Sequence, residues 1–303
     1  AGNRGITKDI FDVVKDGTIP EITFKSFGKS SADLGKIENI FIRGKMRDGN
    51  IFVPAALLDL KDVDGSVTIS NGILLGENIN VRLGNSFGTR GVLELGFEKN
   101  IPFYVETVIQ ADLAQLPPIL KRLVKYKPFL KELSKIKKVS GSALGKMVLD
   151  GSKQSVDVDV YASNINLRGR YGRIPYPLKI KGERFTYKGT QISFDKLNTV
   201  IGKSLFSELS GDITWKNEPY LKIRSHLSKL QMEEIYPWFL SYKNTAAIFE
   251  DFKVTHGITT LSDISLNGPV LRPMNWRINM KGSVENILIE STLSPDPISV
   301  AKG

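Results

Sequence analysis

Apolar and polar residues alternate with a period of two along most of the chain. Val156, Val158 and Val160, for example, are separated by single acidic residues. This spacing places the valines on one face of a strand and the carboxylates on the other. Glycine and Asp-Gly pairs such as Asp48-Gly49 separate the runs and favour tight hairpins. The pattern predicts a mainly β protein with antiparallel strands.

Two stretches replace this alternation with apolar residues at helical spacing. In the first, over 113–138, the apolar residues from Leu116 to Leu123 fall on one helical face. Pro128 disfavours helix at the residue before it, so two helices are expected there. The second stretch covers 229–242 and contains Pro237, which is expected to kink or end the helix. Helix is therefore predicted in these two places.

The same order of elements occurs twice, over about 65–120 and about 182–240. Each copy has alternating strands, a Gly-x-Ser corner, a last strand and an apolar helix, which predicts a structural duplication. We therefore expect a first β-rich unit with a basic helix over 1–139, a second unit with a helix over 140–248, and the start of a further, truncated β unit over 249–303. Three pairs of landmarks are each 117 residues apart: Gly65 and Gly182, Pro102 and Pro219, and Leu113 and Leu230.

The composition limits the partners and the chemistry. With 41% hydrophobic and 24% charged residues over 303 positions, the chain is ordinary globular material. The net charge of +10 favours anionic partners such as nucleic acid, lipid headgroups or acidic glycans, although many soluble domains without such partners are as basic. The absence of cysteine excludes disulfides and thiolate sites. The longest apolar run, Ile51 to Leu58, is too short to span a bilayer.

No group of residues predicts catalysis or a metal site. The two histidines, His226 and His256, are isolated and are interpreted as structural. Asp157 and Asp159 could bind a hard cation or act as an acid/base pair, but a solvated sheet face explains them better. The triplet Gly202–Ser204 lacks the leading glycine of a phosphate-binding loop. We therefore predict no enzyme activity and no cofactor.

A cationic surface is expected on the helical stretch 121–138, where Glu132 is the only acidic residue. Contact with anionic headgroups would gain about 1 kcal/mol for each lysine. A solvated outer helix face is the simpler interpretation and is favoured. The residues proposed for membrane contact are Lys121, Arg122, Lys125, Lys131 and Lys135.

Several strands are apolar on both faces, as over 40–42, 51–53 and 73–75. Such strands need a cover on each side. Either a second sheet or loops seal the second face, or that face forms an apolar groove that binds acyl chains.

The order of these stretches resembles the AsmA-like superfamily of bacterial envelope proteins. The resemblance rests on 63–95, on 155–169 with 177–204, and on 266–291, and it extends over about 37–290. It implies long, curved antiparallel sheets with an apolar concave side, anchored in the inner membrane and projecting into the periplasm. It also implies a role in moving phospholipid towards the outer membrane or in envelope integrity, without catalytic residues. The family's N-terminal membrane helix is missing here, and the sequence looks truncated at both ends. We therefore expect a piece of a longer protein.

We therefore expect an elongated, mainly β fold of curved antiparallel sheets with an open apolar groove, built from a duplicated unit that ends in a short helical segment. The expected function is to hold phospholipid acyl chains in the periplasm between the inner and outer membranes. The alternative is an envelope scaffold or outer-membrane assembly factor without a groove. The expected partners are phospholipid or another acyl-chain lipid, an anionic membrane surface and envelope proteins, but not nucleic acid. The residues expected to line the groove are Val67, Ile69, Leu93, Leu95, Phe97, Phe103, Val105, Val156, Val158, Val160, Phe185, Tyr187, Ile213 and Trp215.

Overall fold

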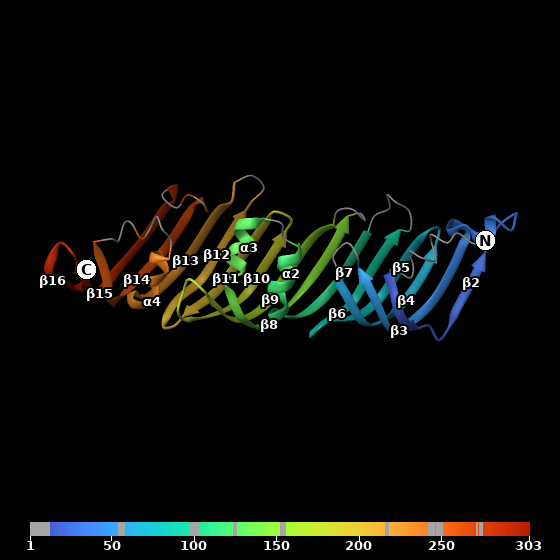
Figure 1. Cartoon of the computed structure of the whole chain (residues 1–303), viewed down its shortest axis with the longest axis horizontal. Helices are drawn as coiled ribbons and strands as arrows, with labels where there is room; N and C mark the ends of the chain where they lie inside the picture. The colour runs from blue at the N-terminus through green and yellow to red at the C-terminus, as the bar shows by residue number, and fades with distance from the viewer. Residues whose placement is uncertain are drawn as a thin grey trace. The chain divides into compact units, whose positions relative to one another are not determined.

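The chain folds mainly into one open antiparallel sheet (Figure 1). A computed structural model describes residues 13–53, 58–96, 103–123, 126–151, 156–215, 218–241, 246, 251–270, 272 and 275–303. Within these ranges the sheet has 16 strands, and strands account for 73% of the structure. The strands lie side by side in chain order, except that β1 and β2 both pair with β3. The prediction of a mainly β protein with antiparallel strands is confirmed.

The chain divides into two compact units, and the first contains residues 1–112 and 144–161. It includes the second half of β8 (Ile136–Gly151) and the first part of β9 (Val156–Tyr171). Its other elements are β1 (Val14–Thr18), β2 (Ile22–Ser26), η1 (Asp33–Gly35), η2 (Ile37–Asn39), β3 (Ile40–Val53), β4 (Leu58–Ser70), β5 (Ile73–Leu83), β6 (Ser86–Gly96) and β7 (Phe103–Asp112).

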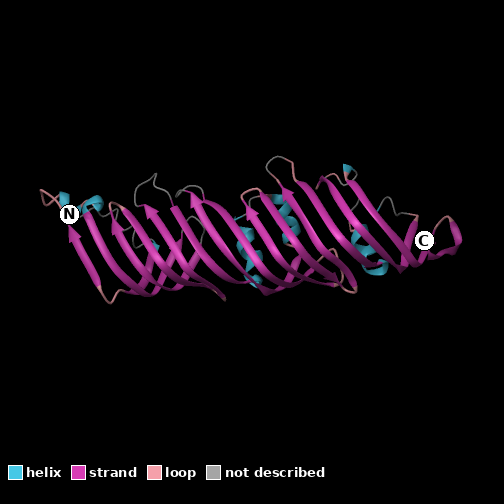
Figure 2. Ribbon diagram, turned by 180° about the vertical axis from the view of Figure 1, so that it is seen from behind, coloured by secondary structure: helices cyan, strands magenta, loops and turns pink. Residues whose placement is uncertain are grey.

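The second unit contains residues 113–143 and 162–303. Its helices α2, α3 and α4 lie on one face of its strands (Figures 1 and 2). Besides the remaining parts of β8 and β9, its elements are η3 (Leu113–Gln115), α2 (Leu116–Leu123), α3 (Lys127–Leu133), β10 (Pro177–Lys188), β11 (Gln191–Ile201), β12 (Ser204–Thr214), β13 (Tyr220–Gln231), α4 (Met232–Leu240), β14 (Phe252–Pro269), β15 (Arg277–Ser291) and β16 (Ser294–Lys302).

The helices lie in the two predicted places but are shorter than expected. The first helical stretch ends at Leu133, and Ile136 already belongs to β8. The helix ends because of a tertiary contact. The carbonyl of Lys135 accepts a hydrogen bond from the N–H of Gly172, in the connection between β9 and β10 (2.9 Å). Residues 229–231 belong to β13, so α4 begins only at Met232.

Most strands contain one residue with a left-handed backbone, although none of these residues is glycine. In the first unit these are Asp48, Asp62, Asn78 and Arg90, with φ between 51° and 54°. Positive φ is uncommon outside glycine. Between β5 and β6, which both carry such a residue, the register shifts by one and then returns. The residues are therefore β-bulges, which bend a strand and add local twist. The corresponding residues of the second unit are Lys138, Asn164, Lys196, Glu208, Asp263 and Asn286.

The bulges also change which residues share a face. In β5, Leu74 precedes the bulge at Asn78, whereas Ile79, Val81 and Leu83 follow it. Strict alternation would place odd and even residues on opposite faces. The one extra residue at the bulge instead keeps both groups on the same face. Side chains from both sides of the bulges accordingly pack around one buried cluster in the first unit: Met46, Ile51, Leu58, Val63, Phe103 and Leu149.

Candidate functional site: apolar rows across the strands

Apolar side chains form a continuous row across five strands of the first unit. Ile42, Ile69, Leu74, Leu95 and Phe103 lie directly opposite one another in β3 to β7. Directly opposed residues of antiparallel strands project from the same face. Five strands at a spacing of about 4.8 Å give this first row a length of about 19 Å.

A second row runs beside the first, two residues away from it in each strand, later in β3, β5 and β7 and earlier in β4 and β6. It consists of Gly44, Val67, Gly76, Leu93 and Val105. A side chain at Gly76 would place its Cβ 2.7 Å from the Cδ1 atom of Ile79, so the end of that isoleucine would have to move. The apolar residues Val67, Leu93 and Val105 are all half-buried and pack against the buried cluster.

Six of the seven groove residues predicted in the first copy, all except Phe97, lie together in these two rows. Ile69 and Phe103 are buried, with 6% and 4% of their surface exposed, whereas Leu95 is only half-buried. On β9, Val158 packs against the same cluster, and Val160 is half-buried. Phe97 and the side chain of Val156 lie outside the described residues.

The second unit has two rows of the same kind. Tyr187, Ile192, Ile213 and Leu221 are directly opposed across β10 to β13. The ring of Trp215 lies against that of Tyr187, with centroids 6.1 Å apart. These side chains are half-buried. The neighbouring row contains Phe185, Phe194, Gly211, Ile223 and Leu266.

Sequence reasoning missed about half of the members of these rows. Ile42, Leu74, Phe194 and Leu266 lie in the same kind of alternating run as the predicted residues. Period two identifies the residues that share a face within one run. It does not say which residue of the next strand lies opposite, and only the register supplies that information.

A second apolar cluster holds α4 against the strands of the second unit. Ile174, Ile201, Leu230 and Ile235 are buried there, and Ile235 of α4 is only 1% exposed. The helix thus covers part of the apolar face of this unit and leaves the rows half-buried.

The Gly-x-Ser corner of the second copy binds a carboxylate of the protein itself. The corner joins β11 to β12, and Glu234 of α4 is buried against it. One carboxylate oxygen, Oε2, accepts hydrogen bonds from the N–H groups of Lys203 (2.8 Å) and Ser204 (3.0 Å) and from the Ser204 hydroxyl (3.0 Å). Gly202 has φ +58°, and a Cβ there would lie 2.3 Å from Glu234 Oε1. The corner therefore positions the first turn of α4.

The three predicted membrane-contact residues whose side chains the structure describes lie on three different segments. Lys121 and Lys131 are exposed on α2 and α3, but Lys135 follows α3 and donates to Glu132 Oε1 (2.7 Å). The side chains of Arg122 and Lys125 lie outside the described residues.

Glu132 is the centre of an ion-pair network. Arg173 donates to both of its carboxylate oxygens (2.9 and 2.6 Å), and the Tyr171 hydroxyl donates to Oε2 (2.6 Å). The Arg173 hydrogen bonds are the main reason why the pKa of Glu132 is lowered to about 2. Arg173 also donates to the carbonyl of Ser241, just after α4. The network therefore ties α3 to the end of α4.

The residues considered for other chemistry are dispersed. His226 and His256 are both exposed, and His256 Nδ1 lies 3.7 Å from Glu233 Oε1. Across the described ranges, no group of three or more acidic, histidine or cysteine residues could hold a metal ion. Over the same ranges, no helix has the length and apolarity needed to cross a bilayer.

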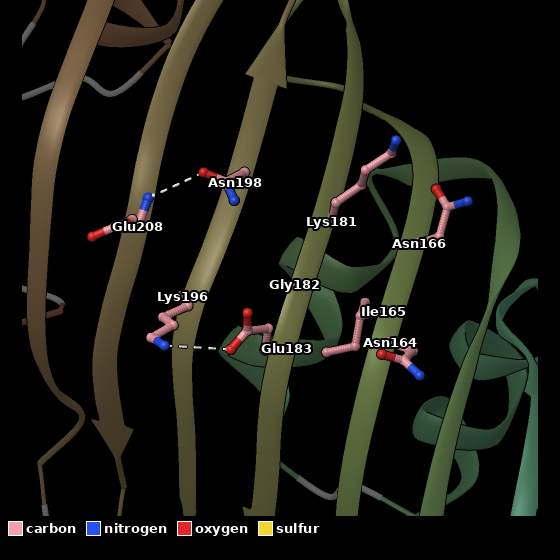
Figure 3. A pocket seen from close by; sticks show the side chains of 9 residues that line it. All are labelled: Asn164, Ile165, Asn166, Lys181, Gly182, Glu183, Lys196, Asn198 and Glu208. Carbon is pink, nitrogen blue, oxygen red and sulfur yellow. Dashed lines mark hydrogen bonds and ion pairs between the residues drawn. The ribbon is translucent and has the colours of Figure 1, made fainter.

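A polar hollow lies in the second unit (Figure 3). It has a volume of about 530 Å³ and opens on the face of β9 to β12 that points away from the helices. Lys196 pairs with Glu183 (3.5 Å) at its side. This hollow is distinct from the apolar rows. Its lining residues are Asn164, Ile165, Asn166, Lys181, Gly182, Glu183, Lys196, Asn198 and Glu208.

Comparison with known proteins identifies no relative of this chain. No family model matches the sequence, and neither a curated protein nor a solved structure is significantly similar to it.

Proposed function

We propose that this chain is a non-enzymatic lipid-binding segment that holds phospholipid acyl chains against its apolar rows. One observation carries the proposal: in each unit, apolar side chains that are buried or half-buried continue from strand to strand without a charged residue between them. The first row of the first unit crosses five strands, from Ile42 to Phe103. A soluble domain normally seals such a surface or uses it to bind a partner.

The energetics suit an acyl chain. Burial of each CH₂ group gains about 0.8 kcal/mol, so a chain along a row of about 19 Å can be held without polar contacts. Neighbouring positions on a uniform apolar wall differ little in energy. An acyl chain could therefore slide from one position to the next, as transfer between membranes requires.

The proposed groove also has support from the bulges. Asp48, Asp62, Asn78 and Arg90 lie in four successive strands, and each bends its strand. Apolar residues before and after the bends pack around the same buried cluster. The proposal is that the bends make this face concave.

A structural duplication is part of the proposal. The row Ile69, Leu74, Leu95 and Phe103 corresponds to Tyr187, Ile192, Ile213 and Leu221 with a constant separation of 118 residues. The bulges at Asn78 and Arg90 correspond to those at Lys196 and Glu208 with the same separation. The corners match as well. Asp112 N–H donates to Ser86 Oγ, and Gln231 N–H donates to Ser204 Oγ, each at 3.0 Å.

The resemblance to the AsmA-like superfamily supplies the proposed setting. In that setting the segment lies in the periplasm, belongs to a protein anchored in the inner membrane, and passes phospholipid towards the outer membrane. The exposed residues Lys121 and Lys131 remain candidates for contact with anionic headgroups. The alternative is an envelope scaffold, and the burial of Ile69 and Phe103 favours it, because a sealed core needs such residues.

The test compares charged substitutions on the two faces of one strand. Leu95→Asp places a carboxylate in the first row, whereas Val92→Asp places one at an exposed position of the same strand, β6. Val158→Asp extends the test to β9. Each variant is purified for lipid mass spectrometry and chemical denaturation. We expect Leu95→Asp and Val158→Asp to lose copurifying lipid while they remain folded, and Val92→Asp to retain it.

The alternative makes the opposite prediction. If the rows are a sealed core, Leu95→Asp unfolds the first unit, and the unsubstituted protein carries no lipid. That pair of results would refute the lipid-binding proposal and leave the scaffold in its place.

A further inference from the structure

The strand β2 lies at an edge of the sheet in the first unit (Figure 1). Among the described strands it pairs only with β3, so its other side carries unpaired backbone groups. The N–H of Phe27 donates to the carbonyl of Asn39, just before β3 (3.0 Å). Backbone groups alternate in direction along an antiparallel strand, so those of Ile22, Phe24 and Ser26 point away from β3. Such an edge is a template for another strand.

Exposed apolar side chains gather at this edge. Ile22 and Phe24 are 59% and 60% exposed, and Phe27, just after β2, is 63% exposed. No other large apolar side chain described in the first unit is as exposed as these. Phe24 lies directly opposite Ile42 and therefore ends the first row. Ile22 lies opposite Gly44 and ends the second row. A contiguous group of this kind marks an interaction surface.

The sequence around β2 is complementary to itself when one copy is read in the opposite direction. Thr23 lies at the centre, with Ile22 before it and Phe24 after it. The next residues outward are Glu21 and Lys25, which carry opposite charges. In an antiparallel pair of two copies about Thr23, each isoleucine faces a phenylalanine and each carboxylate faces an ammonium group. Aromatic and β-branched side chains, opposite charges and two threonines are all favourable cross-strand pairs.

The backbone supports the same register. Ile22 of each copy lies opposite Phe24 of the other, and the backbone groups of both residues point towards the second copy. These two pairs form four hydrogen bonds, and Thr23 faces its equivalent in a non-hydrogen-bonded pair. A register moved by one residue would oppose outward groups to inward ones. A register moved by two residues would lose the opposition of Glu21 and Lys25.

The two charges are available for this contact. Glu21 and Lys25 are exposed, and within the described part of the chain neither takes part in an ion pair. A second copy supplies each of them with an opposite charge and covers the exposed ends of the apolar rows.

We propose that β2 binds β2 of a second copy of this chain in an antiparallel pair centred on Thr23. The dimer has two-fold symmetry, so every contact occurs twice and the interface is closed. Directly opposed residues share a face, so the apolar rows of the two copies lie on the same face of the joined sheet. The dimer is weak and reversible, because a pair of five-residue strands buries less area than a stable interface. The proposal does not rest on lipid binding.

The first experiment uses the absence of cysteine from the chain. In the proposed pair the two Cα atoms of Thr23 are about 4.5 Å apart, within the range of a disulfide. Thr23→Cys should therefore form a covalent dimer under mild oxidation. Lys25→Cys is the matched control on the same face of the same strand. Its two equivalents are four residues out of register, about 14 Å apart along the strands, and should not form a disulfide.

The second experiment exchanges charges and measures dimerisation by sedimentation velocity over a range of concentrations. Glu21→Lys and Lys25→Glu should each weaken the dimer about 10- to 30-fold, since two contacts change from opposite to like charges. An equal mixture of the two variants should dimerise again, because every lysine then faces a glutamate. The controls Glu77→Lys in β5 and Lys61→Glu in β4 change exposed charges of the same unit and should have little effect. Circular dichroism checks that all variants are folded.

Three results would overturn the proposal. A chain that sediments as a monomer at every concentration would leave the edge to a strand of another protein. Equal cross-linking of Thr23→Cys and Lys25→Cys would show random collision or a different register. Failure of the mixed charge variants to dimerise, with both variants folded, would show that Glu21 and Lys25 do not face each other.

Discussion

Replacement of Glu234 by alanine should remove the support on which the first turn of α4 rests. The side chain is 5% exposed, and its Oε2 atom accepts three hydrogen bonds from Lys203 and Ser204. Without it, two backbone N–H groups lose their acceptor, and Ser204 is completely buried. An unsatisfied buried donor costs about 1–3 kcal/mol. The N–H of Lys203 can turn to water because that residue is exposed, so the expected loss is about 2–4 kcal/mol.

The same contact can be broken from the other side by Gly202→Ala. The left-handed backbone at φ +58° costs an alanine about 1–2 kcal/mol. Its Cβ would also lie 2.3 Å from Glu234 Oε1 and displace the carboxylate. Gly202→Ala therefore loses the same hydrogen bonds as Glu234→Ala. In the double variant, Gly202→Ala adds only its backbone strain to the loss caused by Glu234→Ala. The loss of unfolding free energy in the double variant should therefore be smaller than the sum of the two single losses by about 2 kcal/mol or more.

The assay is a double-mutant cycle by chemical denaturation, with amide hydrogen exchange at Lys203 and Ser204 as the local measurement. Gly189→Ala is the matched control. Gly189 also has positive φ (+49°), but its Cβ would have no neighbour within 4 Å. Gly189→Ala and Glu234→Ala should therefore be additive. If Gly202→Ala and Glu234→Ala are additive too, or if exchange at Ser204 is unchanged in Glu234→Ala, the carboxylate does not support the corner.

Two further predictions concern the charge network and the bulges. The pKa of Glu132 is lowered from 4.5 to about 2, chiefly by Arg173, so its contribution to stability is present above pH 4.5 and is lost as the pH falls towards 2. Glu132→Gln should flatten the pH dependence of the denaturation midpoint over that range. If the variant shows the same pH dependence as the unsubstituted protein, the ion pairs of Glu132 do not stabilise the fold. Arg90 is a left-handed bulge residue (φ 54°), so Arg90→Gly should raise the free energy of unfolding by about 0.5–1 kcal/mol. The control Lys222→Gly, in β13, should lower it by a similar amount, and a loss in both would contradict the assignment of the bulge.

The amino-acid sequence determines the local elements of this protein. A segment that alternates as 156–161 does can bury its apolar residues on one face only if it forms a strand. The structure has strands along most of the predicted runs. The two helical stretches stand out for the same reason, because only a period of 3.6 brings Leu116 to Leu123 onto one face. The charge was also visible, including the exposed residues Lys121 and Lys131 of the basic helices.

The sequence did not show which charged side chains form ion pairs. Lys135 was grouped with the other lysines of its stretch, yet it pairs with Glu132, which Arg173 also binds from a segment about forty residues later in the chain. Counting charges along the chain reveals their number, but only the pairing of strands reveals which of them face each other.

The tertiary structure alone decided which apolar residues share a face. Alternation within β5 places Leu74 and Ile79 on opposite faces, and the bulge at Asn78 places them on the same one. Asparagine tolerates positive φ and gives a weak local signal, whereas Arg90 in the facing strand gives none. A bulge is stable here because the neighbouring strand carries a compensating bulge, which restores the register on both sides. The bend belongs to the pair of strands, so neither strand's sequence can specify it alone.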